Sequence, residues 1–222
     1  MSDPTGCRPA GTTFPAPSSS KRNETGSSRQ WSASAQAKGY ARLNIADLAS
    51  EAGISKSTFY KHFRDKESCF LDTYDTVTSL FVAETIKAFE TEDLEWPAQL
   101  EFAIRVAFGY MAAHPLEAKV ITVDVMIAGP AAMERYSAAR RVLATIIDRG
   151  RSHEGSNTDV PPAMAGGVIN GGALLIRHML LSGEIDTLPQ AGPDYLYWAL
   201  APYLGETEAK KWAERARRKL ED

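Results

Sequence analysis

Apolar residues recur at intervals of three and four along most of the chain after residue 43, and alternating, strand-like runs are nearly absent. Such intervals place side chains on one face of an α-helix, so the pattern predicts an all-α fold. Gly, Pro and clusters of polar residues separate the apolar segments and set the helix ends. The expected helices cover residues 45–52, 56–62, 66–88, 98–114, 116–127, 130–149, 162–181, 194–203 and 206–220.

The first two helices carry clear end signals. Asn44 can cap the first helix, and Asp47 places a negative charge in its first turn. Gly53 ends that helix, and Ser55 can cap the second one. We therefore expect two short helices joined by a tight turn and followed by a long connecting helix that begins at Lys66.

The amino-terminal segment has a different composition. Of its first 34 residues, 19 are Ser, Thr, Gly or Pro, and such a segment buries too little apolar surface to offset the entropy of ordering. We expect a disordered tail over residues 1–28, a small helical domain over 29–75 and a larger helical domain over 76–222.

The overall composition is typical of a soluble globular protein, since the chain is 44% hydrophobic and 24% charged, and its two isolated cysteines fit a reducing cytoplasm. Residues 1–20 lack the apolar stretch of a signal peptide, so we expect no export. Residues 160–176 are apolar but interrupted by Pro and Gly, and they fall short of the roughly 20 residues that span a bilayer, so we expect a buried helix and no membrane contact. Cys7 and Cys69 have no metal ligands at the usual spacing, so neither a disulfide framework nor a metal or other cofactor is expected.

Charge is distributed unevenly along the chain. Residues 1–41 carry a net +3, residues 42–66 a net +2 and residues 67–222 a net −8, for a total of −3. A polyanion would therefore meet the amino-terminal part and be repelled by the rest. This asymmetry permits nucleic-acid binding without proving it.

The stretch from residue 44 to residue 63 combines the features of a helix-turn-helix. Leu48, Ile54 and Phe59 can form a small apolar core between the two helices. Ala49 is the small residue where their backbones approach, and Gly53 is the glycine where the chain reverses. The second helix presents short donors and flexible cations suited to base edges and phosphates, namely Lys56, Ser57, Thr58 and Lys61. The plainer alternative is a helical hairpin whose exposed side chains are merely solvated.

The same stretch resembles the DNA-binding segment of the TetR family of transcriptional regulators. The match covers Gly39-Tyr40 and residues 44–71, with the ending Thr58-Phe59-Tyr60-Lys61-His62-Phe63 followed by Lys66-Glu67. The resemblance implies that the DNA backbone is contacted by Asn44, Tyr60, His62 and Lys66. It places in the major groove Lys56, Ser57, Thr58 and Lys61. For His62, a structural role at a helix end is the alternative.

One segment departs from the family's pattern. The family has an amphipathic helix immediately before the Gly-Tyr pair, whereas Ser27 to Lys38 offers only Trp31 and alternating alanines. Either a weak helix forms around Trp31, or the amino-terminal sequence reflects an altered start or reading frame. The alternative function is therefore a helical dimeric small-molecule-binding or interaction protein whose DNA-binding head is impaired.

The resemblance also implies a carboxy-terminal domain that binds a small-molecule effector and pairs two subunits. The candidate dimer surface comprises the glycine-rich helix 162–181 and the aromatic segment 195–203, although both could pack within one subunit. Asn170 and Arg177 lie on one helical face, where they could bind an acidic or carbonyl group or form an interfacial salt bridge. The candidate ligand-binding residues are Phe102, Tyr110, Met126, Met133, Tyr136, Asn170 and Arg177.

Motifs of catalysis are missing from the sequence. It contains no phosphate-binding glycine loop, paired-histidine metal motif or nucleophile elbow, so we expect no enzymatic activity. The prediction is a ligand-responsive transcriptional regulator, with a repressor favoured, that binds double-stranded DNA as a homodimer and responds to an unknown small-molecule effector. Two recognition helices about 34 Å apart would read a near-palindromic operator.

Overall fold

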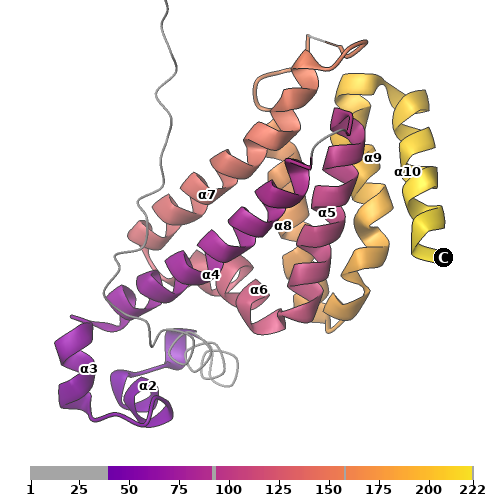
Figure 1. The fold of residues 1–222 in the computed structure, drawn as a ribbon. Coiled ribbons are helices and arrows are strands. Elements are labelled where there is room, and N and C mark those ends of the chain that lie inside the picture. Colours follow the sequence, from indigo (N-terminus) through magenta and orange to yellow (C-terminus); the bar gives the residue numbers. More distant parts are fainter. Residues whose placement is uncertain (1–39, 92–93, 158, 222) are drawn as a thin grey trace, which may run out of the picture.

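The computed structural model describes residues 40–91, 94–157 and 159–221. Within these ranges all regular structure is helical, which confirms the predicted fold class. Three short elements form a head at one end of a long helix, and the larger body is built around the other end of that helix (Figure 1). These four elements are η1 (Tyr40–Arg42), α2 (Ile45–Glu51), α3 (Lys56–His62) and the long helix α4 (Lys66–Phe89).

The body contains the rest of the helices. They are α5 (Trp96–Ala113), α6 (Pro115–Thr122), η2 (Asp124–Ile127), α7 (Pro130–Asp148), η3 (Arg149–Ser152), α8 (Met164–Ser182), η4 (Ile185–Ala191), α9 (Gly192–Leu204) and α10 (Glu206–Glu221). Helix α4 packs against α5 and α7, α8 packs against α6 and α7, and α10 covers α9 at the edge of the body (Figure 1). The expected domain boundary between residues 75 and 76 falls inside α4, so this helix belongs to both parts.

The head is fixed to α4 by a small aromatic core. The rings of Tyr40 and Phe70 meet edge to face with their centroids 5.1 Å apart, and both residues are buried. Leu43 and Phe59 are buried in the same cluster, so η1 and α3 share a core with the first turns of α4. Burial of each large apolar side chain contributes roughly 1.5 to 3 kcal/mol. The head is therefore held to α4 by packing as well as by the chain.

The structure differs from the predicted helices in several places, including these three. The helix expected over 116–127 ends at Thr122, and the chain continues as η2, where the buried Asp124 carboxylate lies 3.7 Å from the Lys119 ammonium. The helix expected from residue 162 begins at Met164, after a turn closed by the Met164 N–H and the Pro161 carbonyl oxygen, 3.0 Å apart. The short 3₁₀ helix η4 was not predicted from the sequence, since it contains Pro189 and is too short to show a period.

Candidate nucleic-acid interface and internal cavity

The α2–turn–α3 unit is shaped by three local devices. The Asn44 side chain accepts from the Asp47 N–H at 3.0 Å, and the Asp47 carboxylate accepts from the Asn44 N–H at 3.3 Å, which together form a capping box. Gly53 then adopts a φ of +64°, a left-handed conformation that favours glycine, and reverses the chain. Ser55 caps α3 by accepting from the Thr58 N–H at 3.0 Å. These devices set the start of each helix and the turn between them.

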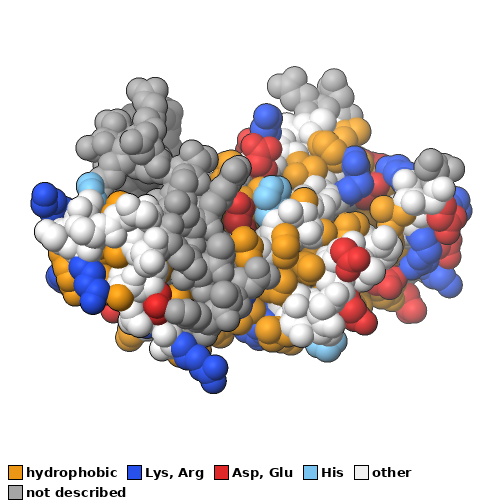
Figure 2. Space-filling model, turned by 90° about the horizontal axis from the view of Figure 1, so that it is seen from below, with side chains coloured by type: hydrophobic (Ala, Val, Ile, Leu, Met, Phe, Trp, Pro, Cys, Tyr) orange, Lys and Arg blue, Asp and Glu red, His pale blue; other side chains and the backbone are white. Residues whose placement is uncertain are grey.

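Helix α3 presents most of its predicted DNA-contacting side chains to solvent. The exposed ones are Lys56, Ser57, Tyr60, Lys61 and His62. Tyr60 is 56% exposed although it is aromatic, so its ring is available to a partner. Figure 2 shows Lys and Arg side chains at the outer edge of the head, on the left of the view. Thr58 differs, because it is half-buried and its hydroxyl lies 2.9 Å from that of Ser55, within the cap.

Lys66 has an internal role that the sequence does not reveal. Its ammonium donates to the carbonyl oxygens of Tyr40 and Leu43 at 3.0 and 3.2 Å and lies 4.3 Å from the centroid of the Tyr40 ring. These contacts tie η1 to the first turn of α4. A shallow hollow beside them brings together four of the predicted DNA-contacting residues, Asn44, Lys56, Tyr60 and Lys66. The predicted phosphate contact of Lys66 would therefore come from an ammonium that already serves two carbonyls.

This part of the chain matches a known family. Residues 33–73 match the model of the family described as "Bacterial regulatory proteins, tetR family". The chain is also 26% identical over 167 residues to the HTH-type transcriptional regulator EthR of Mycolicibacterium smegmatis, a match that covers 72% of this chain and 73% of EthR. The head of the chain therefore matches the DNA-binding domain of the TetR family. The protein is a ligand-responsive, DNA-binding transcriptional regulator.

Solved structures have the same fold at low sequence identity. The transcriptional regulator FadR from Bacillus subtilis in complex with stearoyl-CoA has a TM-score of 0.65 at 16% identity, with 81% of this chain and 98% of FadR covered. SmeT, the repressor of the Stenotrophomonas maltophilia multidrug efflux pump SmeDEF, has a TM-score of 0.66 at 16% identity, with 81% of this chain and 89% of SmeT covered.

Segment 27–38, which departs from the family's sequence pattern, overlaps the start of the family match at residue 33, and it lies outside the described residues. The expected disordered tail 1–28 lies outside them as well.

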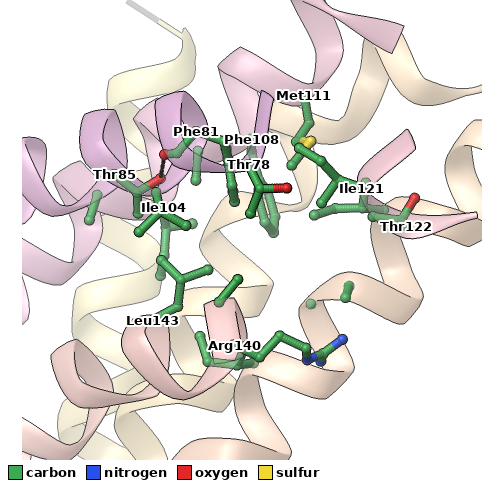
Figure 3. Close-up of a pocket in the computed structure, with 18 of the residues that line it drawn as sticks. Thr78, Phe81, Thr85, Ile104, Phe108, Met111, Ile121, Thr122, Arg140 and Leu143 are labelled. Carbon is green, nitrogen blue, oxygen red and sulfur yellow. Dashed lines mark hydrogen bonds between the residues drawn. The ribbon is translucent and has the colours of Figure 1, made fainter. Parts of the chain in front are cut away.

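The body of the protein encloses a cavity of about 90 Å³. Residues from α4, α5, α6, α7, α8 and α9 line it, and most of their side chains are apolar. Figure 3 shows Phe81 and Phe108 at the upper side of the open space, Ile104 at its left and Leu143 at the lower left. The cavity is smaller than the pockets of 300 to 1,000 Å³ that enclose typical drug-sized ligands. In this conformation it has room only for a small apolar group.

Arg140 of α7 brings a positive charge to the wall of this cavity. In Figure 3 it lies across the open space from Thr78 and Phe108. One guanidinium nitrogen, Nη1, donates to the Tyr136 hydroxyl, and burial lowers the pKa of Arg140. Arg140 was not among the residues predicted from the sequence to bind a ligand. Its spacing could have pointed to it, because it follows Tyr136 by four residues and precedes Leu143 by three. An arginine at that spacing lies on the same helix face as its apolar neighbours.

The structure places only one of the seven predicted ligand-binding residues, Tyr136, in the cavity wall. Tyr110 donates to the Glu117 carboxylate and stacks on His114, while Phe102 lies beside the Arg105 guanidinium. The others lie on η2, α7 and α8 outside the wall, namely Met126, Met133, Asn170 and Arg177. A helical period shows which residues share a face. It does not show which packed faces leave a void between them, and this is why these assignments fail for the cavity.

Helix α8 has one buried face and one exposed face, so the prediction of a buried helix was wrong for half of it. Its exposed face follows intervals of three and four, through Gly167, Asn170, Leu174, His178 and Leu181. Leu174 and Leu181 are 56% and 67% exposed, and Trp198 of α9 is 53% exposed. In length and composition α8 meets the requirements for a membrane-spanning helix, and in the described part of the chain it is the single helix to do so.

The glycines of α8 differ in what surrounds them. A β-carbon at Gly172 would lie 2.7 Å from the Tyr195 hydroxyl oxygen, so α9 approaches α8 closely there. A β-carbon at Gly166, Gly167 or Gly171 would meet no other atom within 4 Å. Within one subunit, the close approach of another helix therefore explains only Gly172 among these four glycines of α8.

Proposed function

We propose that this regulator is a homodimeric repressor that binds near-palindromic operator DNA and is released by a small-molecule effector. The observation that carries the proposal is the exposed face of α3, which presents Lys56, Ser57, Tyr60 and Lys61 beside a capped, rigid turn. Ammonium and hydroxyl groups of this kind suit base edges and phosphates in the major groove. SmeT, a structural neighbour, is itself named a repressor, which supports the repressor assignment. A DNA-binding regulator of this kind acts in the cytoplasm.

Duplexes selected from a random pool test the DNA contacts directly. Fluorescence anisotropy at fixed salt should show weaker binding of Tyr60→Ala to every duplex, because a phosphate contact carries no sequence information. Lys56→Ala should change the preferred sequence, since Lys56 stands at the start of α3 where base edges are read. Lys210→Ala, an exposed lysine on α10 in the body, is the matched control and should bind as the wild type does. Unchanged affinity of Tyr60→Ala would refute the placement of α3 on DNA.

We infer that the exposed faces of α8 and α9 form the dimer interface. Leu174, Leu181 and Trp198 are large apolar side chains left open on these two helices. Gly167 and Gly171 lie on or next to the same face with open space around them, and small residues there allow a second helix to approach. A face of this kind fits a second copy of the chain, since two-fold dimers are the commonest closed oligomers. The exposed Asn170 and His178 on this face favour protein contact over lipid contact.

The oligomeric state can be measured by light scattering coupled to size exclusion. The 24.2 kDa chain should elute at twice its mass, and Leu174→Glu should elute as a monomer because it places a charge in the interface. Leu80→Glu is the matched control, since Leu80 on α4 is 52% exposed against 56% for Leu174. A monomeric wild type, or an equal effect of the two variants, would contradict the proposed interface. A dimer that bound no duplex at low salt would favour the alternative of an interaction protein with an impaired head.

The effector is proposed to bind the cavity of the body. The stearoyl-CoA in the FadR structure supports a small-molecule effector that includes an apolar group, and the mostly apolar wall here fits such a group. Helix α4 lines the cavity with Tyr74 and Thr78 and holds the head through Lys66. A ligand that favours one tilt of α4 over another would therefore change the separation of the two heads.

A further inference from the structure

Arg140 lies in the cavity wall without an acidic partner among the described residues. Other arginines of the same region are paired: Arg135 with Asp75 at 3.3 Å, and Arg151 with Asp148 at 2.7 Å. The charged group that acts on Arg140 is a second cation, Arg177, and its other electrostatic neighbours are the phenols of three tyrosines, Tyr74, Tyr136 and Tyr195. Arg140 is half-buried, with its Nε and Nη2 atoms shielded from solvent, and no counter-ion offsets the partial desolvation of its charge. An anion that binds beside it would therefore be stabilised.

Unused hydrogen-bonding atoms gather around the same cavity. Seven buried side-chain nitrogen and oxygen atoms in the described ranges have no hydrogen-bond partner, and four of them belong to residues of this wall. Two are Nε and Nη2 of Arg140, and the others are the hydroxyl oxygens of Tyr74 and Thr78, which are near enough to act on each other but form no hydrogen bond of normal geometry. Buried polar atoms in native structures are nearly always satisfied, so a cluster of unsatisfied ones points to a missing ligand. Nε and Nη2 form one edge of the guanidinium, and that edge matches the two oxygens of a carboxylate.

We propose that the effector is a small apolar carboxylic acid whose carboxylate binds the Nε–Nη2 edge of Arg140. This proposal rests on the proposed function, in which the body binds an effector, and it specifies the ligand's chemical class. Arg140 brings the one positive charge among the described residues of the cavity wall, since Arg177 lies outside that wall, and this charge balances a carboxylate but only half of a doubly charged phosphate. The hydroxyls of Tyr74 and Thr78 can donate further hydrogen bonds to the acid, and Phe81, Ile104 and Phe108 contact its apolar part.

The size of the cavity limits the apolar part of the acid. An engineered cavity of about 150 Å³ binds benzene, and the present cavity measures about 90 Å³. The acid is therefore no larger than a short branched chain unless the helices separate, so a long acyl chain or a coenzyme A thioester would require a wider cavity. The thioester also lacks a carboxylate at the end of its acyl chain. These two differences separate the free acid from an acyl-CoA in an experiment.

Paired ligands on the wild-type chain provide the first test. Isothermal titration calorimetry without DNA compares isovalerate with isovaleramide, and hexanoate with hexanamide, because each amide has the shape of the acid without its charge. We expect each acid to bind at least about tenfold more tightly than its amide. Equal affinity of acid and amide, no binding of any acid at millimolar concentration, or tighter binding of the coenzyme A thioester of hexanoate than of hexanoate would each overturn the proposal.

A matched pair of variants provides the second test. Arg140→Met should lower the affinity for the acids by about tenfold or more and abolish the preference for acid over amide, because the carboxylate loses its partner. Arg141→Met is the control, since Arg141 is the next residue of α7 and is exposed, and it should keep both the affinity and the preference. A preference that survives in Arg140→Met would also overturn the proposal. Release of operator DNA is measured separately, so an acid that binds without releasing DNA would refute the repressor mechanism and leave the assignment of Arg140 intact.

Discussion

Gly172 of α8 faces Tyr195 of α9, and replacement of this glycine by alanine tests how tightly the two helices pack. The new β-carbon would lie 2.7 Å from the Tyr195 hydroxyl oxygen and 2.8 Å from Cζ, both well inside van der Waals contact. The ring has little freedom to move, because Tyr195 is 5% exposed, donates to the Val168 carbonyl oxygen at 2.9 Å and packs 5.2 Å from the Phe108 ring centroid. Overpacking of this kind costs about 1 to 3 kcal/mol.

The intrinsic helix preference of alanine works in the opposite direction. Alanine in a helix interior is favoured over glycine by about 1 kcal/mol, so we expect Gly172→Ala to lower the free energy of unfolding by about 1 to 2 kcal/mol once the strained Tyr195 hydrogen bond is included. Gly166→Ala is the control on the same helix. A β-carbon at Gly166 meets no atom within 4 Å, and this variant should gain up to about 1 kcal/mol.

Urea denaturation followed by far-UV circular dichroism measures both variants. The midpoint of Gly172→Ala should fall and that of Gly166→Ala should rise, with the slope unchanged if the two states are otherwise alike. Protein concentration must be held fixed, because the stability of a dimer depends on it. A Gly172→Ala protein as stable as Gly166→Ala would refute the close approach of Tyr195 to α8.

Three further predictions concern titratable and charged groups. Lys66→Met removes the ammonium donor from the Leu43 and Tyr40 carbonyl oxygens, of which the Tyr40 oxygen keeps the Leu43 N–H at 3.3 Å, and it should lower the free energy of unfolding by about 1 to 3 kcal/mol. Lys61→Met, an exposed neighbour on α3, should change that free energy by under about 0.5 kcal/mol and instead reduce the salt dependence of DNA binding, and equal stability of the two variants would contradict the internal role of Lys66. Burial raises the pKa of the Cys69 thiol to about 12, so a Cys7→Ser protein should react with iodoacetamide at pH 8 far more slowly when folded than in urea, and equal rates would show that the thiol is accessible. Burial also raises the pKa of the Asp124 carboxyl, so the unfolded chain releases that proton first as the pH rises. The free energy of unfolding of the wild type minus that of Asp124→Asn should therefore fall as the pH rises above about 4, the ordinary pKa of Asp, and a pH-independent difference would be inconsistent with this shift.

The parts of the fold that could be predicted from the sequence depend on short-range interactions. Asn44 and Ser55 each accept a backbone N–H three residues ahead, so the residue types that start α2 and α3 stand next to the helices they cap. The internal role of Lys66 could not be predicted in this way, because its acceptors lie 23 and 26 residues earlier in the chain. A backbone carbonyl is present at every position and leaves no mark in the sequence. The family resemblance therefore assigned to Lys66 a DNA contact and gave no hint of the contact with η1.

The cavity shows a second limit of the same kind. Its wall takes residues from six helices, and the void exists only because of how those helices pack. The large apolar residues chosen as pocket candidates were suited to packing, and packed side chains such as Tyr110 fill space. Arg140 could have been found by a different question, namely which charged residue interrupts the apolar face of a helix. A charged side chain on an apolar helix face needs a partner once it is buried. It therefore indicates a ligand-binding site more often than a buried apolar side chain does.

The position of Thr78 on α4 sets how a ligand in the cavity could act on the head. Thr78 is twelve residues from Lys66, so the two lie about 18 Å apart along the helix axis. Neither Gly nor Pro interrupts α4, and a pull on Thr78 toward Arg140 would therefore move the whole helix with the head attached to it. The Tyr40 hydroxyl also donates to the Ala128 carbonyl oxygen of the body, at 3.5 Å. A tilt that moves the head away from the body would have to break this contact. A ligand that prefers one tilt tenfold contributes about 1.4 kcal/mol per subunit, and two subunits that tilt together would change operator affinity by about a hundredfold.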